Sequence, residues 1–262
     1  MVATGVSRKD ERVLIDLHVH TDRTPGCTID PALAVAKAEA LGLDGVCFTD
    51  RDTLARAANL HTLRNGAKIR VLVGLEAETD HGRFLCFFPD PEDVDVPALL
   101  GSHEPANRRP ARELVEKTLA AGGAVVAATP YDRNLDKPMG DFIFTLRNLS
   151  AVEAFTGTRG ANVNELAIEA ADHLSAPCVG GSGAMTSYDE IGTAATLFKD
   201  DIRNEADLVH ALRAGLVWAV AVGTPPKFHG DDEALRTPRE RPGGRSRPFR
   251  DRRGGRRGGR GR

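Results

Sequence analysis

The chain has 262 residues, 41% of them hydrophobic, which is enough for one sizeable core and one α/β domain. No window approaches the run of about 18 apolar residues that a membrane span needs, and the N-terminus lacks the apolar core of a signal peptide. The four cysteines are scattered without a C-x-x-C pair, which argues against a disulfide framework. We therefore expect a cytoplasmic protein with no membrane partner, in which Cys47 and Cys86 are buried as small hydrophobic residues.

The net charge of −2 is distributed unevenly along the chain. Residues 236–262 contain 12 arginines against two acidic residues, which gives this segment a charge of +10 and leaves −12 for residues 1–235. An acidic body followed by a basic segment indicates an arm that binds polyanions.

The first half of the chain alternates between strand and helix patterns. We expect strands at 13–19, 45–49, 69–75 and 83–88, and helices at 31–41 and 54–64. The first helix carries its own boundary signals, because Asp30 is a suitable N-cap, Pro31 suits the first turn, and Gly42 follows the end.

The second half continues the alternation. We expect helices at 112–121, 162–174 and 206–214, and strands at 124–129, 151–155, within 177–183, and at 217–222. Repeated βα units predict a mostly parallel sheet that closes, or nearly closes, into a barrel. We assign 1–11 to an N-terminal extension and 12–230 to the barrel. Residues 231–262, rich in Arg and Gly, are predicted to be a disordered tail.

Polar residues follow the predicted strands at their carboxyl ends. His18 and His20 end the first strand, Arg51 follows the second, Glu76 follows the third, and Thr129 closes a later one. Ligands of parallel α/β folds bind at this end of the sheet, so we expect the functional site there.

Two histidines one residue apart on a strand point to the same side, so His18 and His20 could share a metal ion. The alternative is a polar strand end without a metal. Asp16 strengthens the metal interpretation, because a carboxylate can orient a ligating histidine. Glu76 could add a carboxylate ligand or be a solvated strand-end residue, and His81 could be a further ligand or a turn histidine.

Five segments, in order, resemble the PHP (polymerase and histidinol phosphatase) domain family over roughly residues 12–222. They are "DLHVHT" at 16–21, "GLDGVCFTDRDT" at 42–53, "GLEAET" at 74–79, "GGAVVAATPY" at 122–131 and "CVGGSGAM" at 178–185. The last looks most like members that end in the PHP-associated region. The resemblance implies a distorted β/α barrel in which two or three divalent metals at the strand ends hydrolyse phosphate esters.

The resemblance assigns His18, His20 and Glu76, and by position His81, to metal binding. Four other ligand positions of the family pattern carry different residues here: Arg51, Thr129, Gly183 and Met185. Arginine cannot ligate because it keeps its proton, glycine has no side chain, and a thioether is too soft for Mn or Mg. We therefore expect a degenerate site with one divalent ion (Mn, Fe or Zn) or none. Asp16 and Asp50 are expected to contact the ligating residues and not the metal itself.

Arg51 has two interpretations. Its guanidinium could replace the positive charge of a missing metal and hold a phosphate bidentately, or it could pair with Asp50 or Asp52 and fill the vacated space. Arg133 could likewise contact phosphate or lie in an ordinary loop turn.

The end of the chain, "RRGGRRGGRGR", is typical of segments that bind RNA or single-stranded DNA with little sequence preference. The arginines that would contact phosphates are Arg252, Arg253, Arg256, Arg257, Arg260 and Arg262. The alternative is a solubilising or self-associating tail.

These observations favour a PHP-fold protein with weak or no hydrolysis that binds a phosphorylated small molecule or a nucleic-acid end in the barrel mouth, and RNA through its tail. One alternative is an active phosphoesterase with a single metal, acting on nucleotides or another phosphate ester. Another is a non-catalytic RNA-binding or interaction protein that acts through the tail.

Overall fold

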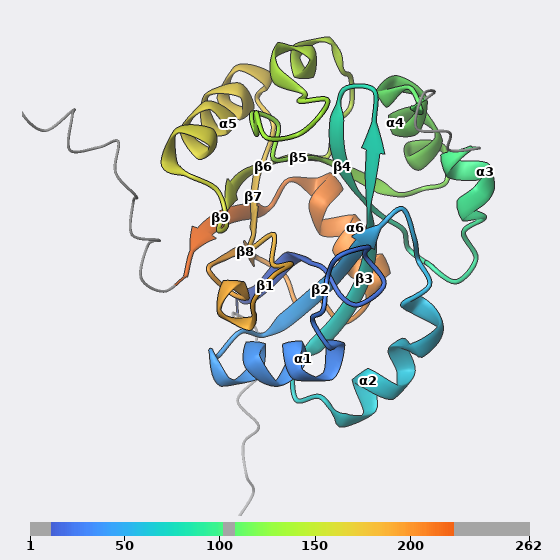
Figure 1. Cartoon of the computed structure of the whole chain (residues 1–262), viewed down its shortest axis with the longest axis vertical. Helices are drawn as coiled ribbons and strands as arrows, with labels where there is room; N and C mark the ends of the chain where they lie inside the picture. The colour runs from blue at the N-terminus through green and yellow to red at the C-terminus, as the bar shows by residue number, and fades with distance from the viewer. Residues whose placement is uncertain (1–11, 102–107, 223–262) are drawn as a thin grey trace, which may run out of the picture. The chain divides into compact units, whose positions relative to one another are not determined.

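The computed structural model describes residues 12–101 and 108–222 (Figure 1). The N-terminal extension and the arginines of the predicted tail lie outside these residues. Within them, the α/β class and the barrel predicted from the sequence are confirmed: nine strands form one sheet in the order β7-β6-β5-β4-β3-β2-β1-β8-β9. Their bounds are β1 Val13–Val19, β2 Gly45–Arg51, β3 Arg70–Thr79, β4 Gly82–Phe87, β5 Ala124–Ala128, β6 Ala151–Thr156, β7 Cys178–Gly181, β8 Ala194–Phe198 and β9 Val217–Ala221.

The sheet is mostly parallel and nearly closed. Strands β1, β2 and β3 pair in parallel, as do β5, β6 and β7, while β4 and β8 run antiparallel to their neighbours. The segment after β7 returns to β1, where Gly183 N donates to His18 O at 2.8 Å. In addition, Gly180 N donates to Thr196 Oγ1 at 2.9 Å, which links the edge strand β7 to β8. The carboxyl ends of the parallel strands therefore gather around β1.

Helices pack on the strands. They are α1 Pro31–Ala40, α2 Leu60–Gly66, α3 Val96–Leu100, α4 Ala111–Ala120, α5 Ala161–Leu174 and α6 Glu205–Ala214, with 3-10 turns η1 Ala57–Asn59, η2 Gly140–Thr145 and η3 Tyr188–Glu190. The predicted cap of α1 is confirmed, because Asp30 Oδ1 accepts from Ala32 N at 2.9 Å and Leu33 N at 3.0 Å. Ile15 of β1 and Leu212 of α6 belong to one buried cluster, which anchors the sheet beneath the site.

The structure differs from the sequence prediction at several elements, since the short helix α3 and the turns η2 and η3 were not predicted. The helix expected at 54–64 is split into η1 and α2, and the strand expected at 69–75 extends to Thr79 because it forms a hairpin with β4. The short strand β8, "AATLF", was not predicted, since five residues without clear alternation carry little signal. Cys47 and Cys86 are free and fully buried, as expected. Among the helices of the described residues, none has the length and apolarity that crossing a membrane requires.

Candidate metal centre

Three predicted ligands come together at the end of β1 and within β3. His18, His20 and Glu76 are buried, and one ligand atom from each lies within 4.8 Å of the others. The two Nε2 atoms are 3.2 Å apart, His18 Nε2 lies 3.4 Å from Glu76 Oε1, and His20 Nε2 lies 3.7 Å from Glu76 Oε2. Two imidazoles and one carboxylate are the three protein ligands of many catalytic zinc sites.

The ring of His18 is oriented by Glu153 of β6. His18 Nδ1 donates to Glu153 Oε1 at 2.7 Å, so its Nε2 faces the cluster. Glu153 is fully buried, and its other oxygen accepts from Thr129 N at 3.0 Å. Sequence analysis missed this residue. The available signal was one acidic side chain inside the apolar strand "AVEAF", where a buried charge needs a partner.

The ring of His20 is oriented by a hydroxyl. His20 Nδ1 lies 3.0 Å from Thr24 Oγ1, and Thr24 donates to Asp50 Oδ1 at 2.9 Å. Since the Thr24 hydroxyl proton goes to Asp50, its oxygen accepts the Nδ1 proton of His20, which leaves Nε2 with a lone pair for the cluster. Asp50 thus supports the site through Thr24.

Asp16 has a different role from the predicted one. Its carboxylate is buried and accepts from three backbone amides, His18 N at 3.2 Å, Ser182 N at 2.8 Å and Gly192 N at 2.9 Å. It therefore ties β1 to the segments between β7 and β8, and the orientation of the His18 ring falls to Glu153 instead. Burial raises the pKa of Asp16, against the lowering effect of these hydrogen bonds.

Two other predicted residues are not brought to the cluster. His81 lies in the β3–β4 turn, where its ring stacks on Phe142 with centroids 3.7 Å apart and lies beside Asp80. The prediction of His81 as a fourth ligand is thus at odds with its position, because the β3–β4 hairpin extends beyond Glu76 and carries the turn away. Arg133 is exposed, and among the described residues its side chain makes no hydrogen bond or ion pair.

Arg51 is the cation nearest the cluster. In the parallel register of β2 and β3, Arg51 pairs with Glu76, and its Nε donates to Glu76 Oε2 at 3.1 Å. Its Nε also lies 3.6 Å from Glu78 Oε1. Arg51 therefore pairs with glutamates of β3 and not with Asp50 or Asp52, which were the predicted partners. Arg83 of β4, which sequence analysis did not single out, adds a second guanidinium 3.7 Å from Glu76 Oε1.

The other three departures from the family pattern also lie against this cluster. The Sδ atom of Met185 is 4.0 Å from Arg51 Nη2. Thr129 has φ +40°, an unusual backbone conformation for a β-branched residue, and donates its N–H to Glu153. Gly183 has φ +65°, and a Cβ there would lie 2.9 Å from Thr158 Oγ1. None of the three supplies a carboxylate or an imidazole.

The electrostatics of the site separate the two histidines. Burial alone would lower the pKa of His18, but the adjacent Glu153 carboxylate, helped by Glu76, raises it to about 10. Burial lowers the pKa of His20 to about 3, and the positive charges of His18 and Arg51 add to this effect. Burial alone would raise the pKa of Glu76, yet His18 and the other nearby cations hold it well below its ordinary value. A proton on His18 Nε2 thus lies between His20 and Glu76.

The residues present fit one divalent ion. Both Nε2 atoms and the Glu76 carboxylate converge, each Nδ1 already has a partner, and the orienting carboxylates are themselves hydrogen-bonded. The side chains Arg51, Thr129 and Met185 offer a guanidinium, a hydroxyl and a thioether, and the nearby carboxylates of Glu153 and Glu78 contact His18 and Arg51.

Comparisons with known proteins agree with this fold. An uncharacterized protein of Methanocaldococcus jannaschii is 27% identical over 164 residues, which is 58% of this chain and 88% of that protein. A two-domain protein from Bacteroides vulgatus containing a predicted PHP-like metal-dependent phosphoesterase superposes with a TM-score of 0.58 at 15% identity, over 82% of this chain and 66% of that one.

A lesion-specific endonuclease from Pyrococcus furiosus also has a TM-score of 0.58 at 15% identity, and here the match covers 80% of this chain and 58% of the endonuclease. At this level of identity both solved structures are similar in fold. The family model described as PHP domain matches residues 16–152, just over half of the chain, and the model described as PHP-associated matches residues 161–217. The chain therefore belongs to the PHP domain family, whose fold is that of metal-dependent phosphoesterases.

Proposed function

We propose that the chain binds one divalent metal ion through His18, His20 and Glu76 and binds a phosphate ester beside it, which it hydrolyses slowly. The observation that carries the proposal is the convergence of the two Nε2 atoms on Glu76, with each Nδ1 held by a separate partner. An ion in such a site supplies positive charge to a phosphoryl group and makes water more acidic.

The surrounding residues would then have separate roles in positioning the ligands and in binding phosphate. Glu153 and Thr24 keep the rings of His18 and His20 in the ligating orientation, and Asp50 holds Thr24. Arg51 is partly exposed at the cluster, so it can release Glu76 and turn its guanidinium toward a phosphate oxygen. One guanidinium neutralises less charge than a second metal ion does, which is why we expect slow turnover.

A second candidate function is binding of a phosphorylated ligand without hydrolysis. It is favoured by the ion pair between Arg51 and Glu76, because a cation that already occupies one ligand oxygen competes with a metal. In both functions the ligand class is a phosphate ester, on a small molecule or at a nucleic-acid end. The similarity in fold to a lesion-specific endonuclease makes nucleic-acid ends a substrate worth testing.

The test is metal content and phosphoesterase activity of the full chain, purified with a tag that contains no histidine after growth with added Mn, Fe and Zn. We expect about one ion per chain, lost in His18→Ala/His20→Ala, and slow chelator-sensitive hydrolysis of phosphate mono- or diesters that falls at least ~100-fold in that variant. The matched control is His61→Ala/His210→Ala, which removes two exposed histidines of α2 and α6.

Metal in the wild type equal to that in the double variant would contradict the metal site. Stoichiometric metal without turnover on any ester, together with binding of inorganic phosphate, would select the second candidate function.

A further inference from the structure

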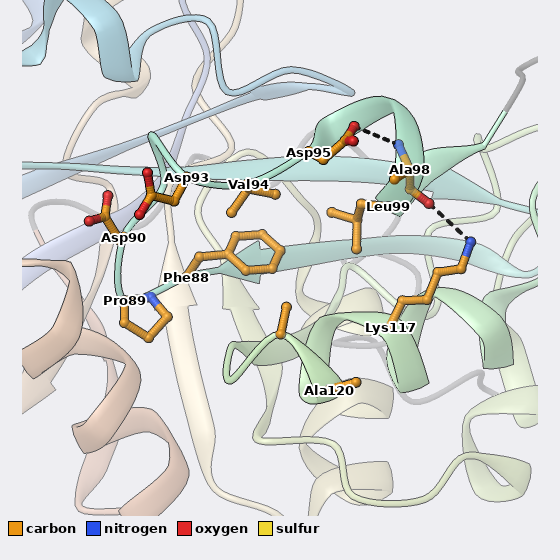
Figure 2. A pocket seen from close by; sticks show the side chains of 11 residues that line it. Phe88, Pro89, Asp90, Asp93, Val94, Asp95, Ala98, Leu99, Lys117 and Ala120 are labelled. Atoms are coloured by element: carbon orange, nitrogen blue, oxygen red, sulfur yellow. Dashed lines mark hydrogen bonds between the residues drawn. The ribbon is translucent and has the colours of Figure 1, made fainter.

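A separate cavity lies at the opposite end of β4 from the metal centre. It has a volume of about 500 Å³, within the range of small-molecule sites. Figure 2 shows its walls: Phe88 follows β4, Val94 belongs to the loop before α3, Leu99 comes from α3, and Ala120 from the end of α4. We call it the Phe88 pocket.

The walls of the Phe88 pocket are mainly apolar. Phe88 and Leu99 are buried side chains of the core, and Val94 and the methyl groups of Ala98 and Ala120 complete the surface. A concave apolar surface that is open to water favours an apolar group that fills it, because that group and the walls both leave water.

The polar residues around the pocket give it a negative charge. Asp90, Asp93 and Asp95 are exposed beside it, and Asp95 Oδ1 accepts from Ala98 N at 2.9 Å as the cap of α3. Asp90 and Asp93 form no ion pair with any described residue, and in Figure 2 they stand together beside Phe88 and Pro89. Asp90 Oδ1 accepts from Glu92 N at 3.3 Å, which leaves both carboxylates with oxygens that can pair with a ligand.

The one cation of the lining, Lys117, is already engaged on the other side of the pocket. Its Nζ donates to Ala98 O at 3.1 Å (Figure 2). The same Nζ pairs with Glu113 Oε1 at 2.8 Å. It closes that side and does not neutralise Asp90 and Asp93. The pocket thus combines apolar walls with unpaired negative charge at one side, and this combination selects a cation over an anion.

The Phe88 pocket is independent of the metal centre. Arg83 at the start of β4 lies 3.7 Å from Glu76, whereas Phe88 follows the other end of the same strand. Five residues of strand separate Arg83 from Phe88 by roughly 16 Å. No residue that lines the pocket belongs to the proposed phosphate-binding machinery.

We propose that the Phe88 pocket binds a small organic cation, with one ring-sized apolar body against Phe88, Val94 and Leu99, and one ammonium or guanidinium group paired with Asp90 and Asp93. A free small molecule fits better than a protein segment, because the cavity is concave, has the volume of one compact ligand, and is closed on one side by Lys117.

The test follows the ¹³C-methyl NMR signals of Val94, Ala98, Leu99 and Ala120 in the full chain during titration with 2-phenylethylamine. Neutral 2-phenylethanol and anionic phenylacetate serve as charge controls. We expect saturable shifts of these methyl groups with the amine, and binding at least ~5-fold weaker for phenylacetate.

Two variants separate shape from charge. Ala120→Trp fills the pocket from an exposed helix position and should abolish the shifts. Asp90→Asn/Asp93→Asn should weaken amine binding about 5-fold and leave 2-phenylethanol unchanged. Glu165→Gln/Glu169→Gln, on the exposed face of α5, is the matched control and should change neither.

Equal affinity for the amine, the alcohol and the carboxylate would overturn the proposal, as would methyl shifts that persist in the Ala120→Trp variant. Binding of an Arg-Phe-Arg peptide at least ~10-fold tighter than the amine would replace the small molecule by a protein segment. His18→Ala/His20→Ala should leave amine binding unchanged, so failure here and failure of the metal site are distinguishable.

Discussion

The early and the late strands of the barrel contribute to the site in different ways. Strands β1 and β3 supply all three groups that can hold a metal, His18, His20 and Glu76. The segments at the ends of β5, β6 and β7 surround them with supporting contacts: Glu153 orients His18, and Gly183 N donates to His18 O. The early segments thus carry the three proposed ligands and also orient His20 through Thr24 and Asp50, whereas the late segments orient His18.

This difference suggests that residues without a ligating side chain can still hold the proposed metal ligands in place. Thr129 and Gly183 stand where the resemblance to the family predicts ligands, and each donates a backbone N–H to the network around His18, one through Glu153 and one directly. We infer that the segments at the ends of β5, β6 and β7 preserve the orientation of His18. The following predictions test this division between strands that carry the proposed ligands and strands that support them.

The largest effect is expected for Glu153→Gln. Glu153 of β6 contacts the proposed ligand His18 but is not itself a proposed ligand. Loss of the carboxylate beside His18 Nδ1 should weaken metal binding about 10- to 100-fold, as measured by calorimetric titration with Zn²⁺. Glu165→Gln on exposed α5 is the control. If the affinity stays within error of the wild type, the late strands do not position the ligands.

Arg51→Ala tests the role of the arginine that ends β2, at a position where the family pattern predicts a metal ligand. Removing the guanidinium 3.1 Å from Glu76 Oε2 should strengthen metal binding about 10-fold and weaken binding of inorganic phosphate by a similar factor. Arg133→Ala is the control, because Arg133 is exposed and should change neither affinity. Phosphate binding that survives in Arg51→Ala would show that Arg51 only fills space beside Glu76.

Gly183→Asp tests whether a carboxylate placed after β7 can add a metal ligand. We expect a loss of about 1–2 kcal/mol in the free energy of unfolding and no additional bound metal, because φ is +65° and the new Cβ would meet Thr158 Oγ1 at 2.9 Å. Urea denaturation and metal content measure the two outcomes. Thr129→Gly, at another residue with positive φ, should cost less, since glycine adopts φ +40° freely. A stable Gly183→Asp protein with a second metal would overturn the division.

The pH dependence of metal-free protein separates the two histidines of β1. Stability contributed by protonated His18 is fully present below pH 6.5 and is lost as the pH rises through its pKa of about 10. Neutral His20 behaves in the opposite way, because its pKa is lowered to about 3: its contribution is present above pH 6.5 and is lost as the pH falls toward 3.

Each histidine should therefore contribute a slope of at most about 1.4 kcal/mol per pH unit, with opposite signs, to unfolding in urea and EDTA. His18→Gln should flatten the alkaline side and, because it removes a positive charge beside His20, also reduce the acidic slope, whereas His20→Gln should flatten the acidic side alone. Loss of both slopes in either variant would contradict the separate assignment.

The smallest effect on the site is expected from deletion of residues 236–262. Metal content and ester hydrolysis should change less than about 2-fold, while affinity for single-stranded RNA should fall strongly and lose its steep salt dependence. The matched control replaces the arginines of this segment by lysines, which keeps charge but removes the planar guanidinium. Unchanged RNA affinity after deletion would exclude the nucleic-acid interpretation of the tail.

Sequence reasoning predicted the parts of this molecule that depend on local pattern. The strand over 13–19, the cap at Asp30 and the grouping of His18, His20 and Glu76 follow from side-chain period and from the rule that parallel strands end together. Glu153 was not predicted because its role depends on a hydrogen bond to His18, which lies 135 residues earlier in the chain. The actual role of Asp16 depends on backbone amides of Ser182 and Gly192, which no local pattern reveals.

The proton on His18 has a consequence for how the site is filled. Because it lies between His20 Nε2 and Glu76, an ion that binds at the proposed site would have to displace this proton into solution. In weakly buffered solution this displacement would acidify the medium by one equivalent per chain. If the proposed metal site is correct, acidic storage would favour the proton and mildly alkaline solution would favour the metal.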